Sequence, residues 1–185
     1  MVIGPDVTRA PRDDERAEVR RIVETAFGGS EEAELIEAMR RDGALAYEFV
    51  KPWAGGLQGY LALGRLGAPD DWFFPALLAV RPEAQRGALG PDRRGQRHYQ
   101  IGRRLMDELS TVVRAQARGW PKVIVCHGPG PLLDRFGFDQ QAASSLGSPL
   151  RGQWPLGVLA SGDADLSASL EFPRAWRPVT PMWLR

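Results

Sequence analysis

Two amphipathic helices are expected near the start of the chain, because apolar residues recur there with a helical period. The first follows Asp13 or Asp14, either of which can cap it, and ends at Gly28-Gly29. Its apolar stripe consists of Val19, Ile22, Val23, Ala26 and Phe27. The second follows Ser30, which is expected to cap it, has an acidic first turn and ends at Gly43. Its inward positions are Leu35, Ile36 and Met39.

Strand patterns lie before and after these helices. Residues 2–8 are predicted to form a first strand. Residues 45–50 and 57–66 read as two more, and Trp53-Ala54-Gly55-Gly56 between them indicates a hairpin. After a short turn, the apolar run 73–80 is expected to be the next strand of this meander.

The strongest helical periodicity spans residues 101–118, and Gly119 and Pro121 are expected to end the helix. Its apolar face consists of Ile101, Leu105, Leu109, Val112 and Val113. The apolar run 122–126 predicts a buried strand. Because a helix separates it from the strand at 73–80, the two strands are expected to be parallel.

The C-terminal part of the chain is rich in Gly, Pro and Ser. A brief helix is expected over residues 132–136. Residues 154–160 and 166–172, separated by Ser-Gly-Asp, are predicted to pair as a late hairpin. Trp176 and Trp183 are expected to pack the tail against the domain or a partner.

An arginine-rich stretch lies between the strand at 73–80 and the helix at 101–118. Six arginines crowd it against one acid, Asp92: Arg86, Arg93, Arg94, Arg97, Arg103 and Arg104. A basic loop that leads into a helix N-terminus can hold phosphate groups through backbone N–H groups and arginine side chains. The alternative is a solvated surface loop that is rich in arginine.

Composition indicates one globular domain of residues 1–185, with a core over about 2–172 and a tail over 173–185. The 43% hydrophobic and 25% charged fractions are ordinary, and a net charge of +1 argues against a nucleic-acid partner. No membrane span or signal peptide is expected.

The single cysteine, Cys126, excludes an internal disulfide and is expected to be an inert buried thiol. We expect a cytoplasmic protein, and the C-terminal tryptophans suggest a homodimer.

Three segments resemble motifs of the GNAT superfamily of N-acetyltransferases. Two resemble its acetyl-CoA-binding segment: Val80-Arg81-Pro82-Glu83-Ala84-Gln85 and Gln100-Ile101-Gly102-Arg103-Arg104-Leu105-Met106. The third, Asp134-Arg135-Phe136-Gly137-Phe138, resembles the ending of the second cofactor-side motif. The resemblance implies an α/β (α+β) fold, in which helices flank a mixed, mostly antiparallel sheet.

Two registers of the phosphate loop are open, because residues 86–99 separate the halves of the motif. One is Gln85-Arg86-Gly87-Ala88-Leu89-Gly90, which Pro91-Asp92 separates from the helix. The other is Arg97-His98-Tyr99-Gln100-Ile101-Gly102, which we prefer because the helix follows without a break. In this register Gln100 stands where the family prefers glycine, and its side chain lies where the backbone should approach the pyrophosphate.

The resemblance implies acetyl-CoA as the acyl donor and a primary amine, on a small molecule or a protein, as the acceptor. It places strand residues against the pantetheine arm and loop residues against the pyrophosphate. The cofactor-binding residues that it implies are Leu78, Ala79, Val80, Arg97, His98, Tyr99, Gln100, Ile101, Gly102 and Arg103.

Acyl transfer to an amine needs a base, and the candidates are Glu48 on a strand and His127 just past a strand. The family commonly has a tyrosine that protonates the leaving thiolate. Leu133 stands at that position and cannot donate a proton. Tyr60 and Tyr99 are substitutes if the fold brings them to the site.

Two other functions remain open. Leu133, Gln100 and the inserted loop would also suit a catalytically degenerate protein that binds an acyl-CoA as a sensor. The arginine-rich stretch would suit an interaction protein with an acidic or nucleic-acid partner, although the net charge near zero argues against it.

Overall fold

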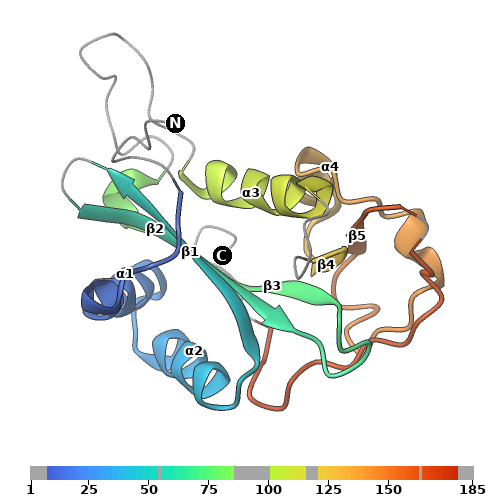
Figure 1. The fold of residues 1–185 in the computed structure, drawn as a ribbon, viewed down its shortest axis with the longest axis horizontal. Helices are drawn as coiled ribbons and strands as arrows, with labels where there is room; N and C mark the ends of the chain where they lie inside the picture. The colour runs from blue at the N-terminus through green and yellow to red at the C-terminus, as the bar shows by residue number, and fades with distance from the viewer. Residues whose placement is uncertain (1–7, 54–55, 86–100, 116–120, 163, 179–185) are drawn as a thin grey trace, which may run out of the picture.

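The structure is a computed structural model that describes residues 8–53, 56–85, 101–115, 121–162 and 164–178. Within these residues five strands form one sheet in the order β1-β2-β3-β4-β5. The strands are β1 (Leu45–Trp53), β2 (Gly56–Arg65), β3 (Phe73–Val80), β4 (Val123–His127) and β5 (Leu156–Ala160). The helices are α1 (Arg16–Phe27), α2 (Glu31–Arg41), α3 (Ile101–Ala115) and α4 (Gly130–Arg135). α1 and α2 cover one face of the twisted sheet, and α3 covers the other (Figure 1).

Both expected N-terminal helices form, and their apolar stripes face the sheet. The buried residues of α1 are Val19, Ile22, Val23 and Ala26, and those of α2 include Leu35, Ile36 and Met39. Gly28 ends α1 with φ of 79°, a left-handed conformation that glycine adopts without a steric cost. Ser30 precedes α2 but does not cap it, because its hydroxyl donates to the Glu34 carboxylate at 3.0 Å.

The predicted cap of α1 is wrong. Asp13 and Asp14 lie in a 3-10 turn, η1 (Asp13–Glu15), and neither caps the helix. The turn is instead held by Glu15, which is 7% exposed. Its carboxylate pairs with the Arg9 guanidinium at 2.6 Å and accepts the Arg12 backbone N–H at 2.8 Å. The hydrogen bond from Arg9 is the main reason why the pKa of Glu15 falls to about 2.

The expected meander is confirmed. β1 pairs antiparallel with β2, and β2 pairs antiparallel with β3. After α3 the chain returns as β4, which pairs parallel with β3 at Phe73 and Ile124, as the strand–helix–strand order predicted. β5 completes the sheet antiparallel to β4.

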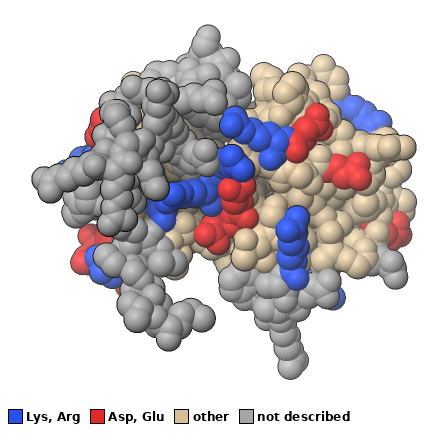
Figure 2. Space-filling model, turned by 90° about the horizontal axis from the view of Figure 1, so that it is seen from above, with Lys and Arg blue, Asp and Glu red and all other residues tan. Residues whose placement is uncertain are grey.

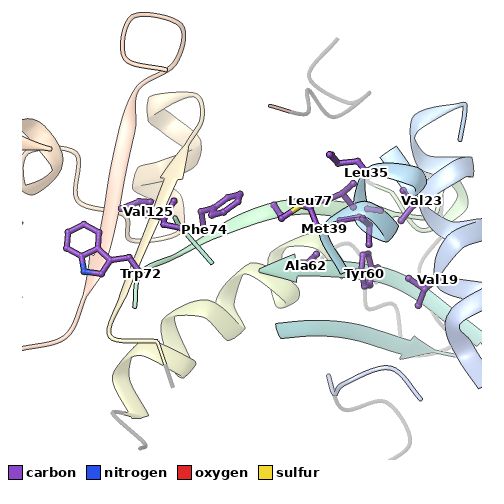
Figure 3. Close-up of a cluster of buried hydrophobic side chains, with 14 of the residues drawn as sticks. Val19, Val23, Leu35, Met39, Tyr60, Ala62, Trp72, Phe74, Leu77 and Val125 are labelled. Carbon is purple, nitrogen blue, oxygen red and sulfur yellow. The ribbon is translucent and has the colours of Figure 1, made fainter. Parts of the chain in front are cut away.

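The sheet is buried on both faces along β2. Tyr60 and Ala62 point into the core under α1 and α2, together with Val19, Val23 and Met39. Figure 3 shows these five side chains between the helices and the strands, with Leu77 beside them. The opposite core lies under α3 and contains Leu61, Leu63, Ile101, Leu105 and Leu109. A strand in the middle of a covered sheet therefore alternates between two cores rather than between a core and water.

The predicted late hairpin is wrong, because β5 pairs with β4 and not with residues 166–172. That segment instead crosses to other parts of the fold: Ser169 bridges to Gly147, and Glu171 bridges to Ala68. The segment then brings Trp176 back onto the sheet, as expected for this tryptophan. Residues 2–7, Gly119 and Trp183 lie outside the described residues.

No helix in the described ranges combines the length and the apolar character that a membrane crossing requires.

Candidate functional site

A cavity of about 600 Å³ opens where β3 and β4 separate beyond their pairing at Phe73 and Ile124. One side of the cavity is formed by β3 and the other by β4 with the turn that follows it. Its β3 lining consists of Phe74, Pro75, Ala76, Leu77, Leu78 and Val80. Its β4 lining is Val125, Cys126 and His127. Two strands that separate in this way leave backbone groups unpaired on their facing edges, and a ligand can use these groups.

The backbone of β3 faces this cavity at Leu78 and Val80. Directly after the strand, Arg81 donates its backbone N–H to the Gln58 carbonyl of β2 at 3.0 Å. Because antiparallel pairs alternate, Ala79 directs its N–H and C=O towards β2, and Leu78 and Val80 direct theirs away from it. The Val80 carbonyl accordingly accepts a hydrogen bond from the Gln85 side chain at 3.0 Å.

A bulge interrupts β3 at Ala76. The register between β2 and β3 shifts here, since Ala62 lies opposite Leu77 and Leu63 lies opposite Pro75. The carbonyl of Ala76 accepts a hydrogen bond from the indole N–H of Trp176 at 3.1 Å. Sequence reasoning missed this bulge, although a proline inside an apolar strand is its usual signal.

The first turn of α3 forms one end of the cavity. Ile101, Gly102 and Arg103 line it, and Gln85 lies nearby in the lining. Backbone N–H groups at a helix N-terminus have no partner within the helix and attract anions. The structure therefore brings together the described part of the predicted loop and the Leu78 and Val80 backbone; Arg97, His98, Tyr99 and Gln100 lie outside the described residues.

A glycine on β2 sets the position of this helix end. A Cβ on Gly59 would lie 2.5 Å from Ile101 Cγ2 and 2.9 Å from Leu105 Cδ1. No real side chain tolerates such contacts, so α3 packs this closely only because residue 59 has no Cβ.

Aromatic residues form the other end of the cavity. Phe172 and Trp176 stack with ring centroids 4.6 Å apart and an interplanar angle of 26°. Phe74 meets both of them edge-on, at 5.0 Å and 4.7 Å. We call these three residues the aromatic cluster. Two of its members belong to the C-terminal segment, for which the sequence predicted a hairpin and a packed tail but no site.

His127 lies in the cavity wall beside this cluster and is held in one tautomer. Its Nδ1 lies 3.2 Å from the Trp154 carbonyl, which can only accept, so Nδ1 carries the hydrogen. Its Nε2 lies 2.7 Å from Ser148 Oγ and accepts from that hydroxyl. Burial lowers the pKa of His127 below its ordinary value, which keeps the ring neutral at pH 7.

Cys126 also lines the cavity, but its thiol is not activated. Burial raises the pKa of Cys126 to about 12, so the group stays protonated at neutral pH.

The other described candidates for catalysis, Glu48 and Tyr60, lie away from the cavity lining, and Tyr99 lies outside the described residues. Glu48 pairs with the Arg40 guanidinium at 2.5 Å and accepts the Tyr60 hydroxyl at 2.6 Å. Burial raises the pKa of Tyr60, so the phenol is a fixed donor to Glu48. Leu133 is 1% exposed and packs in the core under α3, whereas Leu132 beside it lines the cavity.

Charges on the face seen from above in Figure 2 are mixed in sign. Seen from above, lysine and arginine side chains lie beside aspartate and glutamate rather than in one continuous basic area (Figure 2). Arg81, within the motif, is also neutralised, because it pairs with Glu18 of α1 at 2.8 Å. In the described ranges no group of three or more His, Cys, Asp or Glu is placed to hold a metal ion.

The sequence matches no protein-family model and no curated protein. Several solved structures are similar in fold. The GNAT family N-acetyltransferase YhbS from Escherichia coli, solved with CoA, has 21% identity and a TM-score of 0.70 over 92% of this chain and 91% of that one. A GNAT family acetyltransferase from Brucella melitensis, solved with acetyl-CoA, has 21% identity and a TM-score of 0.64 over 91% and 96%. A putative GNAT acetyltransferase from Desulfovibrio desulfuricans has 19% identity and a TM-score of 0.55 over 83% and 98%.

Proposed function

We propose that this chain, which has the GNAT fold, transfers an acetyl group from acetyl-CoA to a primary amine in the cavity between β3 and β4. The observation that carries the proposal is the separation of these strands beyond Phe73 and Ile124. It leaves the backbone of β3 facing a cavity that runs to the N-terminus of α3. Two structures of the same fold were solved with CoA or acetyl-CoA, which supports this choice of donor.

The residues of the cavity fit such a donor at two points. The start of α3, with Gly102 and Arg103, offers backbone N–H groups and a cation for the pyrophosphate. The outward backbone of Leu78 and Val80 offers the donors and acceptors that an amide-containing pantetheine arm needs. We assign Arg97, His98, Tyr99 and Gln100 to the same phosphate loop from the sequence alone.

Acetyl-CoA, when bound, supplies an acetyl group that is activated as a thioester. The backbone N–H of Leu78 is the group that we propose to stabilise the negative charge on the carbonyl oxygen during attack. Ala79 does not serve this purpose, because its N–H points towards β2. A fixed backbone donor in an apolar cavity needs no reorganisation when the charge develops.

The base that we propose is His127. With Nδ1–H held by the Trp154 carbonyl, the basic lone pair is on Nε2, which accepts from the Ser148 hydroxyl and can take the proton of the amine through that hydroxyl. Glu48 is less suited, because it does not line the cavity and its carboxylate already pairs with Arg40. The leaving thiolate needs no acid, since a thiol has an ordinary pKa of about 8.5.

Calorimetric titration with acetyl-CoA tests the proposal. We expect binding in the micromolar range that weakens about tenfold or more in an Arg97→Ala/Arg103→Ala variant, because two charge-assisted contacts to phosphate are removed. Arg104→Ala is the matched control, since Arg104 is exposed on α3 but does not line the cavity, and it should bind as the parent does. Absence of binding at millimolar acetyl-CoA would overturn the proposal.

One observation favours a second candidate, an acyl-CoA sensor that does not turn over. Among the described cavity residues there is no tyrosine, and Leu133 at the family's tyrosine position is buried. Release of CoA in the presence of amines distinguishes the two functions. A sensor would bind acetyl-CoA and release none.

A further inference from the structure

We infer that the acceptor is an aromatic monoamine, a molecule with one amino group on a flat apolar body. This inference rests on the proposed function and adds the substrate class. Three observations carry it: the aromatic cluster at one end of the cavity, the absence of carboxylates from the described lining, and the position of His127 beside the cluster.

The aromatic cluster contributes apolar ring surface to the lining of the cavity. Phe172 and Trp176 stack on each other and are half-buried, and both line the cavity. The polar atom of Trp176 is already used, because its indole N–H donates to the Ala76 carbonyl. What remains for a ligand is therefore the ring surface, and a flat aromatic ligand gains most from stacking or edge-on contact with such surfaces.

The charges of the described lining argue against a polycationic acceptor. No aspartate or glutamate lies among these residues, and the charged groups are the guanidinium groups of Arg103 and Arg135. Each additional ammonium of a polyamine or an aminoglycoside would lose its water without gaining a counter-charge. A substrate with one amino group avoids this cost, because that group gives up its proton in the reaction.

The base lies at a suitable separation from the cluster. The His127 and Phe172 ring centroids are 6.2 Å apart. The short side chain of an arylalkylamine can span this separation, so its ring would lie on the cluster while its nitrogen faces His127. The nitrogen would then also lie near β3, whose backbone we assign to the acyl donor.

The alternative occupant of this apolar surface is the acyl chain of a longer donor. The experiment distinguishes an aromatic acceptor from such an acyl chain. Acetylation by the full chain is measured as the release of CoA, with 2-phenylethylamine, n-hexylamine and spermidine as the acceptors. Hexanoyl-CoA replaces acetyl-CoA in a parallel series. Phe172→Leu keeps the apolar volume and removes the flat face, and Phe172→Tyr keeps the ring as the matched control.

We expect kcat/KM for 2-phenylethylamine to exceed that for spermidine and for n-hexylamine by about tenfold, the size of one aromatic contact. The ratio of 2-phenylethylamine to n-hexylamine should fall about tenfold in Phe172→Leu and be kept in Phe172→Tyr. A preference for spermidine, or an unchanged ratio in Phe172→Leu, would overturn the inference. A loss of kcat/KM in Phe172→Leu that occurs only with hexanoyl-CoA would also overturn the inference, because it would assign the aromatic cluster to the acyl chain of the donor.

Binding data separate failure of this inference from failure of the proposed function. If acetyl-CoA binds and n-hexylamine or spermidine is acetylated but 2-phenylethylamine is not, the proposed function stands and the aromatic monoamine is excluded. If acetyl-CoA does not bind, the proposed function fails, and calorimetry with 2-phenylethylamine alone then decides the ligand class. Binding that is weakened in Phe172→Leu would support it, and no binding would overturn it.

Discussion

The chemistry of His127 depends on two hydrogen bonds and on burial. The carbonyl of Trp154 fixes the hydrogen on Nδ1, and the hydroxyl of Ser148 donates to Nε2. Burial disfavours the imidazolium, so the pKa of His127 lies below 6.5. A neutral ring at pH 7 is able to accept a proton, which is the state that a base for an amine requires.

This arrangement predicts the pH dependence of acetylation. Because burial lowers the pKa of His127, kcat should decline only at a lower pH than that at which an ordinary imidazole takes up a proton. His127→Gln should lower kcat about 100-fold or more and remove this acid limb. The measurement is kcat against pH between 5 and 8.

Glu48→Gln is the matched comparison for His127→Gln. It should retain the acid limb, although its melting temperature should fall because Arg40 loses one of its two charged partners, Glu48, and keeps the other, Glu37. If Glu48→Gln removed the limb instead and His127→Gln kept it, Glu48 would be the base.

At the level of elements, the position of α3 relative to β2 decides whether the phosphate end of the cavity exists. The contact is made by Ile101 and Leu105 on the bare backbone of Gly59. The start of α3 and the outward backbone of Val80 are neighbours in the cavity lining because of this close packing.

We therefore predict that Gly59→Ala displaces the first turn of α3. A Cβ at 2.5 Å from Ile101 Cγ2 overpacks the interface and should cost about 1–3 kcal/mol of stability. Acetyl-CoA binding should weaken more than the loss of stability alone explains, since the phosphate end moves. Urea unfolding and calorimetry measure the two effects.

The control for Gly59→Ala is Gly29→Ala. No atom lies within 4 Å of a Cβ placed on Gly29, so both stability and acetyl-CoA affinity should be nearly unchanged. Equal effects of the two substitutions would contradict the packing argument.

At the level of the whole molecule, the C-terminal segment completes a site that the middle of the chain begins. Trp176 donates to Ala76, a contact between residues 100 positions apart in the sequence. Phe172 and Trp176 thereby join Phe74 of β3 at the end of the cavity. The segment contributes to the packing of the fold and to the shape of the site at once.

Two substitutions of Trp176 separate its hydrogen bond from its packing. Trp176→Phe leaves the Ala76 carbonyl without its donor and should cost about 1 kcal/mol in free energy of unfolding. Trp176→Ala also removes the ring contacts with Phe74 and Phe172 and should cost about 3 kcal/mol. Urea unfolding measures both, and equal losses would show that the ring adds nothing beyond its N–H.

The sequence by itself determined the helices, the strands β1 to β4 and the parallel return after α3. These features follow from local periodicity, glycines at helix ends and the order of elements, all of which can be read from neighbouring residues. The expectation of a GNAT fold, based on three short segments, is confirmed by the similarity to solved structures. The sequence also selected His127, Ile101, Gly102 and Arg103, which the structure places in one cavity lining.

Only the tertiary structure decided how distant segments meet. The return of residues 166–178 to other parts of the fold depends on contacts between segments that periodicity does not relate. The same holds for the location of Glu48, whose strand was predicted but whose partners, Arg40 and Tyr60, come from two other elements. A pattern along the chain specifies which face of an element is buried. It does not specify which other element covers that face. The aromatic end of the cavity depends on this covering, because the C-terminal segment packs there against β3.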